Sequence, residues 1–356
     1  MPINRDNPDL ACCDCGDDIP IADRFFHYDG DDVRCQSCYE HSFEGEEEPF
    51  EDDSFGSILS YSTKPRTRFY HDTGKYSFQP NHFYYKGREL NRPYMGCELE
   101  GECPEDENRY EWAELIANRT DNFIYCKDDC SIHNGFEMVS HAMELDFVHN
   151  HSDDWRSAIK DMRKAGWRAW DASNCGFHIH IEKKSFVDAK HEMKFIYFIF
   201  RNKAKLVKFV GRNSEYARFN LESFINVRSD YWNDNKPNIL EVVKGVRKDG
   251  GYVPGPMERN LAVNRSNENT HELRIFKPSL RFETLISYFE FTHCLWAFTK
   301  ELDYQTIIKR DALYQFDVFA EFAHDNAGLY PHFVERLHKR RVVSKPVGWK
   351  DISDDK

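Results

Sequence analysis

Residues 96–102 have the sequence GCELEGE, and residues 174–181 have the sequence NCGFHIHI. In both stretches two ionisable side chains stand two residues apart: Glu98 and Glu100, His178 and His180. Successive side chains of a β-strand point to opposite faces, so each pair shares one face and the apolar residues between share the other. Both stretches are therefore predicted to be half-buried strands with a polar face and a core face.

Two further strand-like segments have the same pattern. Residues 135–140 carry Glu137 among apolar neighbours, and residues 271–276 carry Glu272 and Arg274. Any half-exposed antiparallel strand shows such alternation, so one segment alone indicates little. Four segments that place carboxylates or imidazoles there favour a functional site. If they form one sheet, its polar face collects Glu98, Glu100, Glu137, His178, His180, Glu272 and Arg274.

The residue types on this face indicate a chemistry. Clustered carboxylates repel one another unless a cation neutralises them. Glutamates with one or two histidines suit Mg²⁺ or Mn²⁺, because hard cations prefer oxygen ligands. An arginine beside them suits a phosphate or a carboxylate, which its forked donors match. Together these features predict a metal-dependent site that handles phosphate.

Helical patterns alternate irregularly with these strands. Residues 152–165 place apolar side chains every three to four positions, with Ser152 as the expected N-cap and Gly166 as the stop. A second helix is expected to start near Ser185 and Asp188 and to continue to Val210. A third is predicted over residues 283–298. This order favours an α+β fold with a mainly antiparallel sheet.

Composition excludes several classes of protein. Of the 356 residues 40% are apolar, enough for a sizeable core, and 61 acidic residues against 48 basic ones give a net charge of −13. This charge disfavours wide nucleic-acid contact. No apolar run is long enough for a membrane span, and no secretory signal is recognisable at the first residues. Eleven cysteines without such a signal indicate a reducing, cytoplasmic location.

Paired cysteines near the amino terminus predict a zinc site. Two Cys-x-x-Cys motifs, separated by nineteen residues, place four thiolates in the spacing of a structural site: Cys12, Cys15, Cys35 and Cys38. Cys13, His27 or His41 are alternative ligands. Residues 1–43 are too few for a core of their own, so Zn²⁺ would supply much of the folding free energy. The acidic charge of this module favours docking to a protein.

The next segment separates this module from the rest of the chain. Residues 44–53 (EGEEEPFEDD) contain seven acidic residues, which repel one another and stay solvated. Residues 44–60 are therefore predicted to be a linker, with an acidic loop of the main domain as the alternative. Residues 61–350 are predicted to form the catalytic domain.

The ordered motifs resemble a known family. The sequences GCELEGE (96–102), KDDCSIHNGFEMVS (127–140), NCGFHIHI (174–181), and ERNLAVN (258–264) followed by HELRIF (271–276) are similar to those of the amidoligases of bacteria and their phages. These amidoligases are similar to glutamine synthetase and γ-glutamylcysteine synthetase. The resemblance covers residues 90–300. This chain has Cys130 where the family usually has glycine and Ala142 where it usually has proline, which leaves the role of Asp129 open.

The resemblance implies a glutamine-synthetase-like curved antiparallel sheet flanked by helices, and an ATP- and Mg²⁺-dependent carboxylate–amine ligase. ATP would phosphorylate a carboxylate, and an amine would attack the acyl phosphate to form an amide or isopeptide bond. The implied metal ligands are Glu98, Glu100, Glu137, Glu272 and one of His178 and His180. Arg274 and Arg259 would hold the phosphate or the carboxylate, and Asn264 and Ser131 would orient the substrate.

Two other functions stay open at this point. A metal-dependent hydrolase could use His178 and His180 to hold zinc or manganese while a glutamate activates water. A non-catalytic adaptor could use the zinc module for docking and the larger domain for binding. The basic stretch that includes Arg212 is either a solvated helix face or a patch that faces a nucleotide.

Overall fold

The computed structural model describes residues 57–71, 74–78, 80, 92–169, 175–219, 260–302 and 315–344. For four short strands it describes the backbone alone: β1 (His27–Asp29), β2 (Asp32–Arg34), β6 (Phe83–Tyr85) and β7 (Arg88–Leu90). The predicted zinc ligands (Cys12, Cys15, Cys35 and Cys38), the acidic run 44–53 and Arg259 lie outside the described residues.

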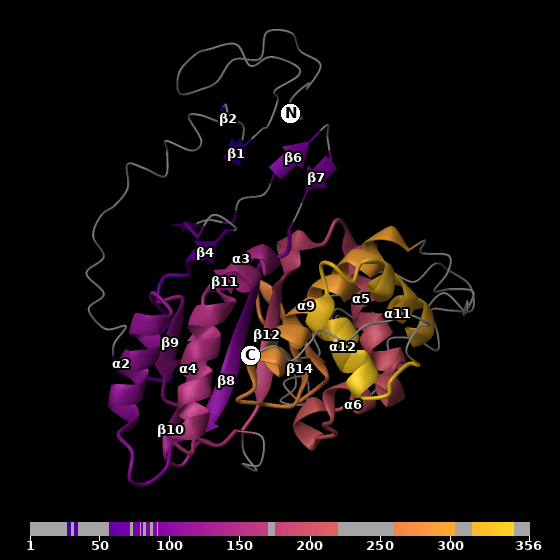
Figure 1. Cartoon of the computed structure of the whole chain (residues 1–356). Helices are drawn as coiled ribbons and strands as arrows, with labels where there is room; N and C mark the ends of the chain where they lie inside the picture. Colours follow the sequence, from indigo (N-terminus) through magenta and orange to yellow (C-terminus); the bar gives the residue numbers. More distant parts are fainter. Residues whose placement is uncertain are drawn as a thin grey trace, which may run out of the picture.

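A large mixed sheet forms the centre of the described chain (Figure 1). Its main path runs, in spatial order, through β13 (Val263–Asn264), β14 (Thr270–Phe276), β12 (Phe177–Glu182), β8 (Met95–Glu102), β10 (Gly135–Ser140), β9 (Ile124–Lys127) and β3 (Ile58–Leu59). Three short strands join it beside this path: β11 (Ala142–Met143), β4 (Phe69–Tyr70) and β5 (Tyr76–Ser77).

The α+β prediction is confirmed, and the sheet is mixed. The central pairs from β13 to β9 are antiparallel, whereas β3 pairs with β9 and β4 pairs with β11 in parallel. The apolar residues of the central strands face the core, where Leu99, Ile179 and Leu273 are fully buried. The alternation in the sequence therefore predicted the core side of each central strand.

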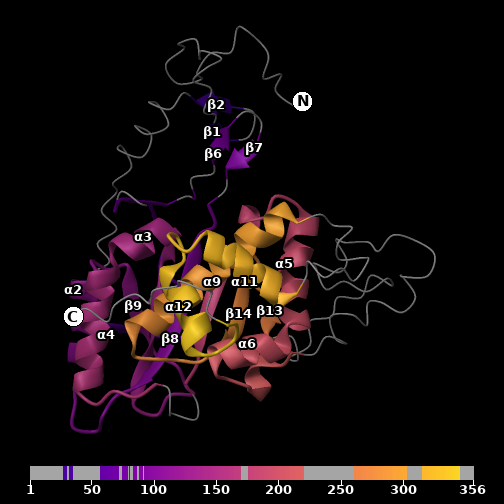
Figure 2. The ribbon, with the colours of Figure 1, turned by 45° about the vertical axis from the view of Figure 1, so that its right-hand side comes forward.

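Helices cover the apolar face of the sheet. Their bounds are α2 (Arg109–Arg119), α3 (Leu145–Asn150), α4 (Ser152–Lys164), α5 (Ala189–Arg201), α6 (Lys203–Val210), α9 (Phe282–Glu301), α11 (Phe316–Asp325) and α12 (Pro331–Lys339). Two 3-10 turns are η2 (Lys183–Ser185) and η3 (Glu215–Ala217). Figures 1 and 2 show α11 and α12 on the outer side of α9, with the strands behind it. No helix in the described ranges is long and apolar enough to cross a membrane.

The helix boundaries correct two details of the sequence analysis and confirm two others. Helix α4 includes Ser152, and the cap residue His151 makes no side-chain cap bond, so the expected Ser152 cap is wrong. Asp188 does cap α5, because its carboxylate accepts the N–H of His191 at 2.7 Å. The single helix expected up to Val210 is two helices, interrupted at Asn202. The stop at Gly166 is confirmed by its left-handed φ of 91°.

Helix α9 carries a buried carboxylate that joins three helices. Glu290 Oε1 lies 3.1 Å from His149 Nε2 and 2.9 Å from His332 Nδ1, and Oε2 accepts the Phe333 N–H at 2.6 Å. Helix α12 has no side-chain cap of its own, so Glu290 satisfies one of its unpaired N–H groups. A carboxylate with these partners can be buried in an otherwise apolar helix, which attaches α12 and α3 to α9.

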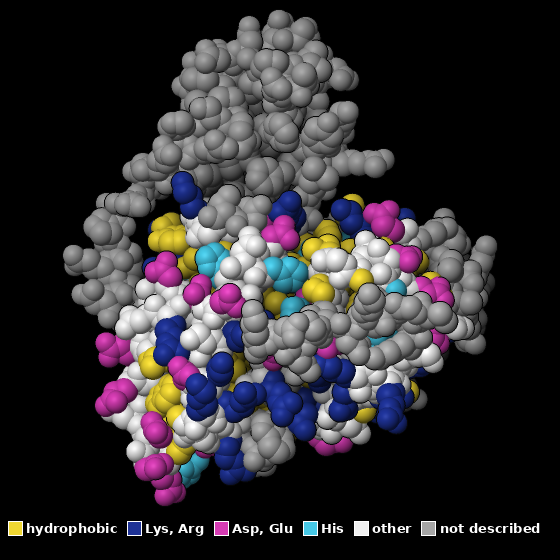
Figure 3. Space-filling model, viewed as in Figure 1, with side chains coloured by type: hydrophobic (Ala, Val, Ile, Leu, Met, Phe, Trp, Pro, Cys, Tyr) yellow, Lys and Arg dark blue, Asp and Glu magenta, His cyan; other side chains and the backbone are white. Residues whose placement is uncertain are grey.

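Basic side chains gather on the face shown in Figure 3, over α4, α6 and α12, although the net charge of the chain is −13. Two basic residues, Lys208 and Arg340, join the carboxyl ends of α6 and α12. Arg340 Nε donates to the Lys208 carbonyl at 3.0 Å, and Lys208 Nζ donates to the Arg341 carbonyl. Positive charge is favourable at a helix carboxyl end, so these two residues have a structural role here.

The close pairing of β8 and β10 depends on a glycine. A Cβ on Gly135 would lie 1.9 Å from the Gly101 carbonyl oxygen, a backbone atom that cannot swing away. We predict that Gly135→Ala lowers the free energy of unfolding by about 1–3 kcal/mol or more, because the strands must separate.

Urea unfolding followed by circular dichroism measures this effect. Gly328→Ala is the matched control, because no atom lies within 4 Å of a Cβ there. The control is expected to stay within about 0.5 kcal/mol of the wild type. Equal stability of the two variants would contradict the packing argument.

Candidate functional site

The strand register brings the predicted polar residues together. Strand β8 lies between β12 and β10, and residues directly opposite each other on neighbouring strands have side chains on the same face. The pairs across these strands are His178 with Glu98 and Glu137 with Glu100, and His180 pairs with Glu272 on β14 at the other side of β12. Four segments that are distant in the sequence thus contribute to one group of side chains.

His178 lies at the centre of this group. Its Nδ1 is 3.1 Å from Glu98 Oε2 and 3.5 Å from Glu272 Oε1. His180 approaches the other oxygen of Glu98, with 3.1 Å between Nε2 and Oε1, while its Nδ1 is 3.1 Å from the Thr270 hydroxyl. Glu98 therefore has an imidazole beside each carboxylate oxygen.

A glycine allows the strands to approach on the other side of His178. The Gly176 N–H donates to Glu100 Oε2 at 2.5 Å. A Cβ on Gly176 would lie 2.8 Å from His178 Nε2 and 3.4 Å from Glu100 Oε1. Any larger residue at 176 would therefore displace the imidazole or the carboxylate.

Two groups of three side chains have the geometry to hold a cation. They are Glu98, His178 and Glu272, and Glu100, Glu137 and His178; in each group the ligand atoms lie within 4.8 Å of one another. A neutral imidazole has one lone pair, so His178 can be a ligand in one group and an N–H donor in the other. Among the described residues these groups do not include His180, whose Nε2 instead lies 3.1 Å from Glu98 Oε1.

The clustered carboxylates repel one another, which disfavours their charged forms. Burial, together with the Glu98 and Glu100 carboxylates, raises the pKa of Glu137 to about 9. Burial also raises the pKa of Glu100. Burial opposes ionisation of Glu98 too, but the His180 and His178 imidazoles outweigh it and hold the pKa of Glu98 well below its usual range. A divalent cation would relieve this repulsion, so the donor set fits Mg²⁺ or Mn²⁺.

Basic and amide side chains border the acidic group. Arg274 Nη1 bonds to Glu272 Oε1, and the Asn264 amide donates to Glu272 Oε2 at 2.8 Å. Asn264 thus contacts a predicted metal ligand, and its role in orienting a substrate stays a prediction. Burial lowers the pKa of Arg212, and the nearby Glu100 carboxylate opposes that effect. Arg212, which donates to the Phe276 carbonyl at 2.9 Å, therefore lies near Glu100, next to the site.

The remaining predicted residue, Ser131, lies on an exposed turn between β9 and β10. Its N–H bonds to Asp129 Oδ1 at 2.7 Å. The Asp129 charge contributes to the raised pKa of both Glu100 and Glu137, so the turn lies near the acidic group.

The sequence analysis missed other residues that contact the site. Thr270 stands two residues before Glu272 on the same strand, so the alternation of faces could have identified it. Asn267 lies in the turn before β14, and its amide is 3.4 Å from Glu272 Oε2. No periodic signal in the sequence points to a turn residue of this kind.

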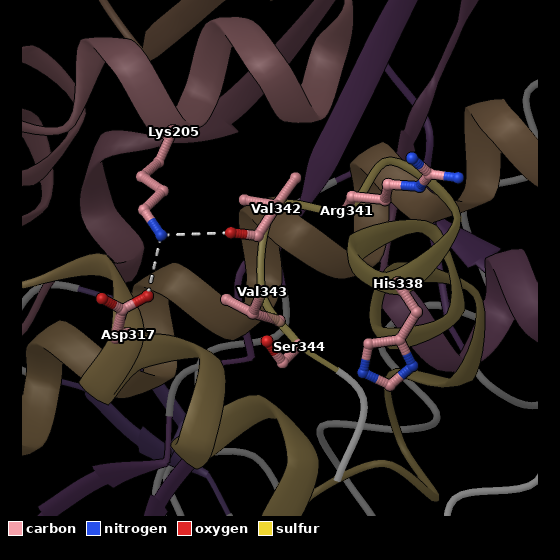
Figure 4. Close-up of a pocket in the computed structure, with 7 residues that line it drawn as sticks. All are labelled: Lys205, Asp317, His338, Arg341, Val342, Val343 and Ser344. Atoms are coloured by element: carbon pink, nitrogen blue, oxygen red, sulfur yellow. Dashed lines mark hydrogen bonds and ion pairs between the residues drawn. The ribbon is translucent and has the colours of Figure 1, made fainter.

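A separate cavity lies at the junction of α6, α11 and the segment after α12. Its volume is about 620 Å³, and Figure 4 shows its lining residues: Lys205, Asp317, His338, Arg341, Val342, Val343 and Ser344. Lys205 Nζ lies 3.0 Å from Asp317 Oδ1 and donates to the Val342 carbonyl at 3.1 Å. These contacts are structural, and none of the predicted site residues lines this cavity.

Comparisons with known proteins give little further information. No protein-family model and no curated protein matches the chain. Among solved structures, the chain is similar to one in the complex between the prokaryotic ubiquitin-like protein Pup and its ligase PafA, with a TM-score of 0.32 and 10% sequence identity. The match covers 70% of this chain and 64% of that one.

We predict that Mn²⁺ or Mg²⁺ stabilises the protein through the two carboxylate–imidazole groups. A cation at 100 times its dissociation constant adds about 2.7 kcal/mol to the free energy of unfolding. Gly176→Ala should remove most of this gain, because the methyl group displaces His178. Thermal unfolding with and without the cation measures both effects.

Gly96→Ala, on the neighbouring strand β8, is the matched control. A Cβ there meets its nearest neighbour at an ordinary 3.5 Å, from the Ser140 carbonyl oxygen. The control should retain the stabilisation by Mn²⁺. A wild type that gains no stability from either cation would show that the site does not bind them.

Proposed function

We propose that the protein is an ATP-dependent carboxylate–amine ligase that uses Mg²⁺ or Mn²⁺. The observation that supports this most directly is the convergence of Glu98, Glu137, His178 and Glu272 on one face of the sheet beside Arg274. The order of the motifs in the sequence supports the same proposal. The proposal includes a curved sheet like that of glutamine synthetase, as the sequence motifs predict.

The proposed reaction has two steps. A substrate carboxylate oxygen attacks the γ-phosphorus of ATP, and ADP leaves while an acyl phosphate forms. The amine nitrogen then attacks the acyl carbon, phosphate leaves, and the nitrogen loses a proton to give an amide. The bound cations would neutralise charge on the phosphates.

The side chains of the chain have distinct proposed roles. Glu98, Glu100, Glu137, Glu272 and His178 hold the cations. Arg274 lies beside Glu272 and would bind an oxygen of the transferred phosphoryl group or of the carboxylate; Arg259 is proposed for the same task from its motif. Arg212 lies next to Glu100, where its positive charge suits a nucleotide phosphate. Ser131 remains a proposed substrate contact.

The proposed domain organisation follows the sequence. Residues 1–43 are proposed to bind a structural Zn²⁺ through Cys12, Cys15, Cys35 and Cys38 and to dock to a protein partner. Residues 44–60 connect this module to the ligase domain, residues 61–350. The ligase substrates are a carboxylate and an amine.

The placement of His180 weakens the hydrolase alternative. That mechanism needs His178 and His180 to hold one metal ion together. The His180 Nε2 atom instead lies 3.1 Å from Glu98 Oε1, and the cation-binding groups of the described chain contain His178 without it.

We predict ADP release that requires both a carboxylate and an amine. The assay supplies ATP, Mg²⁺ and a panel of carboxylates with hydroxylamine as a small amine, and detects ADP and the hydroxamate. The double variant Glu98→Gln, Glu100→Gln should slow the reaction by about 100-fold or more, because several kcal/mol of charge stabilisation are lost.

Glu114→Gln is the control, since this carboxylate is exposed on α2, away from the site. It should retain the wild-type rate. Metal-dependent hydrolysis without nucleotide would favour the hydrolase. Absence of both reactions in the wild type would favour the adaptor.

A further inference from the structure

The turn between β13 and β14, residues 265–269, faces the carboxylate of Glu272. Asn264, at the end of β13, donates its amide to Glu272 Oε2 at 2.8 Å, and the Asn267 amide approaches the same oxygen at 3.4 Å. The other oxygen, Oε1, faces His178 and Arg274. Both carboxylate oxygens of Glu272 are thus held, in a side chain that is almost fully buried.

The Asn264 side chain is itself held in one orientation. Its Oδ1 accepts the Ser266 N–H at 3.0 Å and the Ser266 hydroxyl at 2.6 Å. With two donors on Oδ1, the amide nitrogen must point the other way, toward Glu272. Ser266 therefore acts on Glu272 through Asn264.

The turn is also tied to the strand that carries the two histidines. Lys183 follows β12 directly, and its Nζ donates to the carbonyls of Arg265 at 3.0 Å and Asn267 at 2.5 Å. The Lys183 N–H donates to the Asn269 carbonyl at 2.9 Å. Because these bonds join the turn to the end of β12, the distance between Glu272 and His178 cannot change freely.

We propose that Lys183, Asn264, Ser266 and Asn267 are positioning residues that hold Glu272 in the orientation needed to bind a divalent cation with His178 and Glu98. This inference rests on the cation-binding part of the proposed function and not on the ligase reaction. Groups that hydrogen-bond to metal ligands fix the ligand orientation in advance, and their loss typically weakens metal binding by about 10–100-fold.

The experiment measures Mn²⁺ affinity of the full chain by electron paramagnetic resonance of free Mn²⁺, with thermal unfolding in parallel. Ser266→Ala removes the hydroxyl that orients Asn264, and Asn267→Ala removes the second amide. Each should weaken Mn²⁺ binding by about 10-fold or more at an unchanged melting temperature without the metal. Ser266→Thr keeps a hydroxyl on an exposed residue and should bind within about threefold of the wild type.

Asn269→Ala is the matched control in the same turn. Asn269 is exposed, and its recorded contact uses the backbone carbonyl, so its substitution should leave Mn²⁺ affinity unchanged. Unchanged affinity in both Ser266→Ala and Asn267→Ala would overturn the inference. So would an equal loss in Asn269→Ala, or a wild type that binds no Mn²⁺.

The same measurements separate this inference from the ligase proposal. If the wild type binds Mn²⁺ and the two variants bind it weakly, the positioning role holds even when no carboxylate and amine support ADP release. That combination would contradict the ligase alone.

Discussion

The register between β8 and its two neighbours is the constraint on which the site depends. It places Glu98 opposite His178 and Glu100 opposite Glu137, with Leu99 between them on the core side. Side chains alternate with a period of two, so a slip of one residue would move every carboxylate into the apolar core. The buried apolar face against α9 makes such a slip unfavourable, and the hydrophobic core thereby aligns a polar site on the opposite face.

That alignment has an electrostatic cost, which the residues around the site partly offset. His180 and His178 stabilise the charge of Glu98, and Arg274 with Asn264 stabilises that of Glu272. Lys127 favours the charge of Glu137, but burial and the Glu98 and Glu100 carboxylates outweigh it, so the pKa of Glu137 is raised. The partners of Glu98 and Glu272 therefore stabilise both carboxylates in their charged forms, whereas Glu137 needs a cation or a proton.

The sequence predicted the strands better than the positions of their side chains in space. The four polar segments form adjacent strands, and the helix stop at Gly166 was found because a left-handed glycine has a local signature. The polar face was expected to be half exposed, yet Glu100, Glu137, His178 and Glu272 are buried. The hydrogen bond from Asn264 to Glu272 was also unpredictable from the sequence. It depends on Ser266, which orients the amide, and on strand pairing, which brings the carboxylate within reach.

The sequence by itself determined which side chains share a face of each strand, since that follows from the two-residue period of an extended chain. It also determined the chemistry on offer: carboxylates, imidazoles and an arginine suited to cations and phosphates. Only the tertiary structure decided that His178 is central while His180 lies beside Glu98, and that Lys183 bonds to the turn beside Glu272. The physical reason is that strand order and register arise from packing between distant segments, which no local pattern encodes.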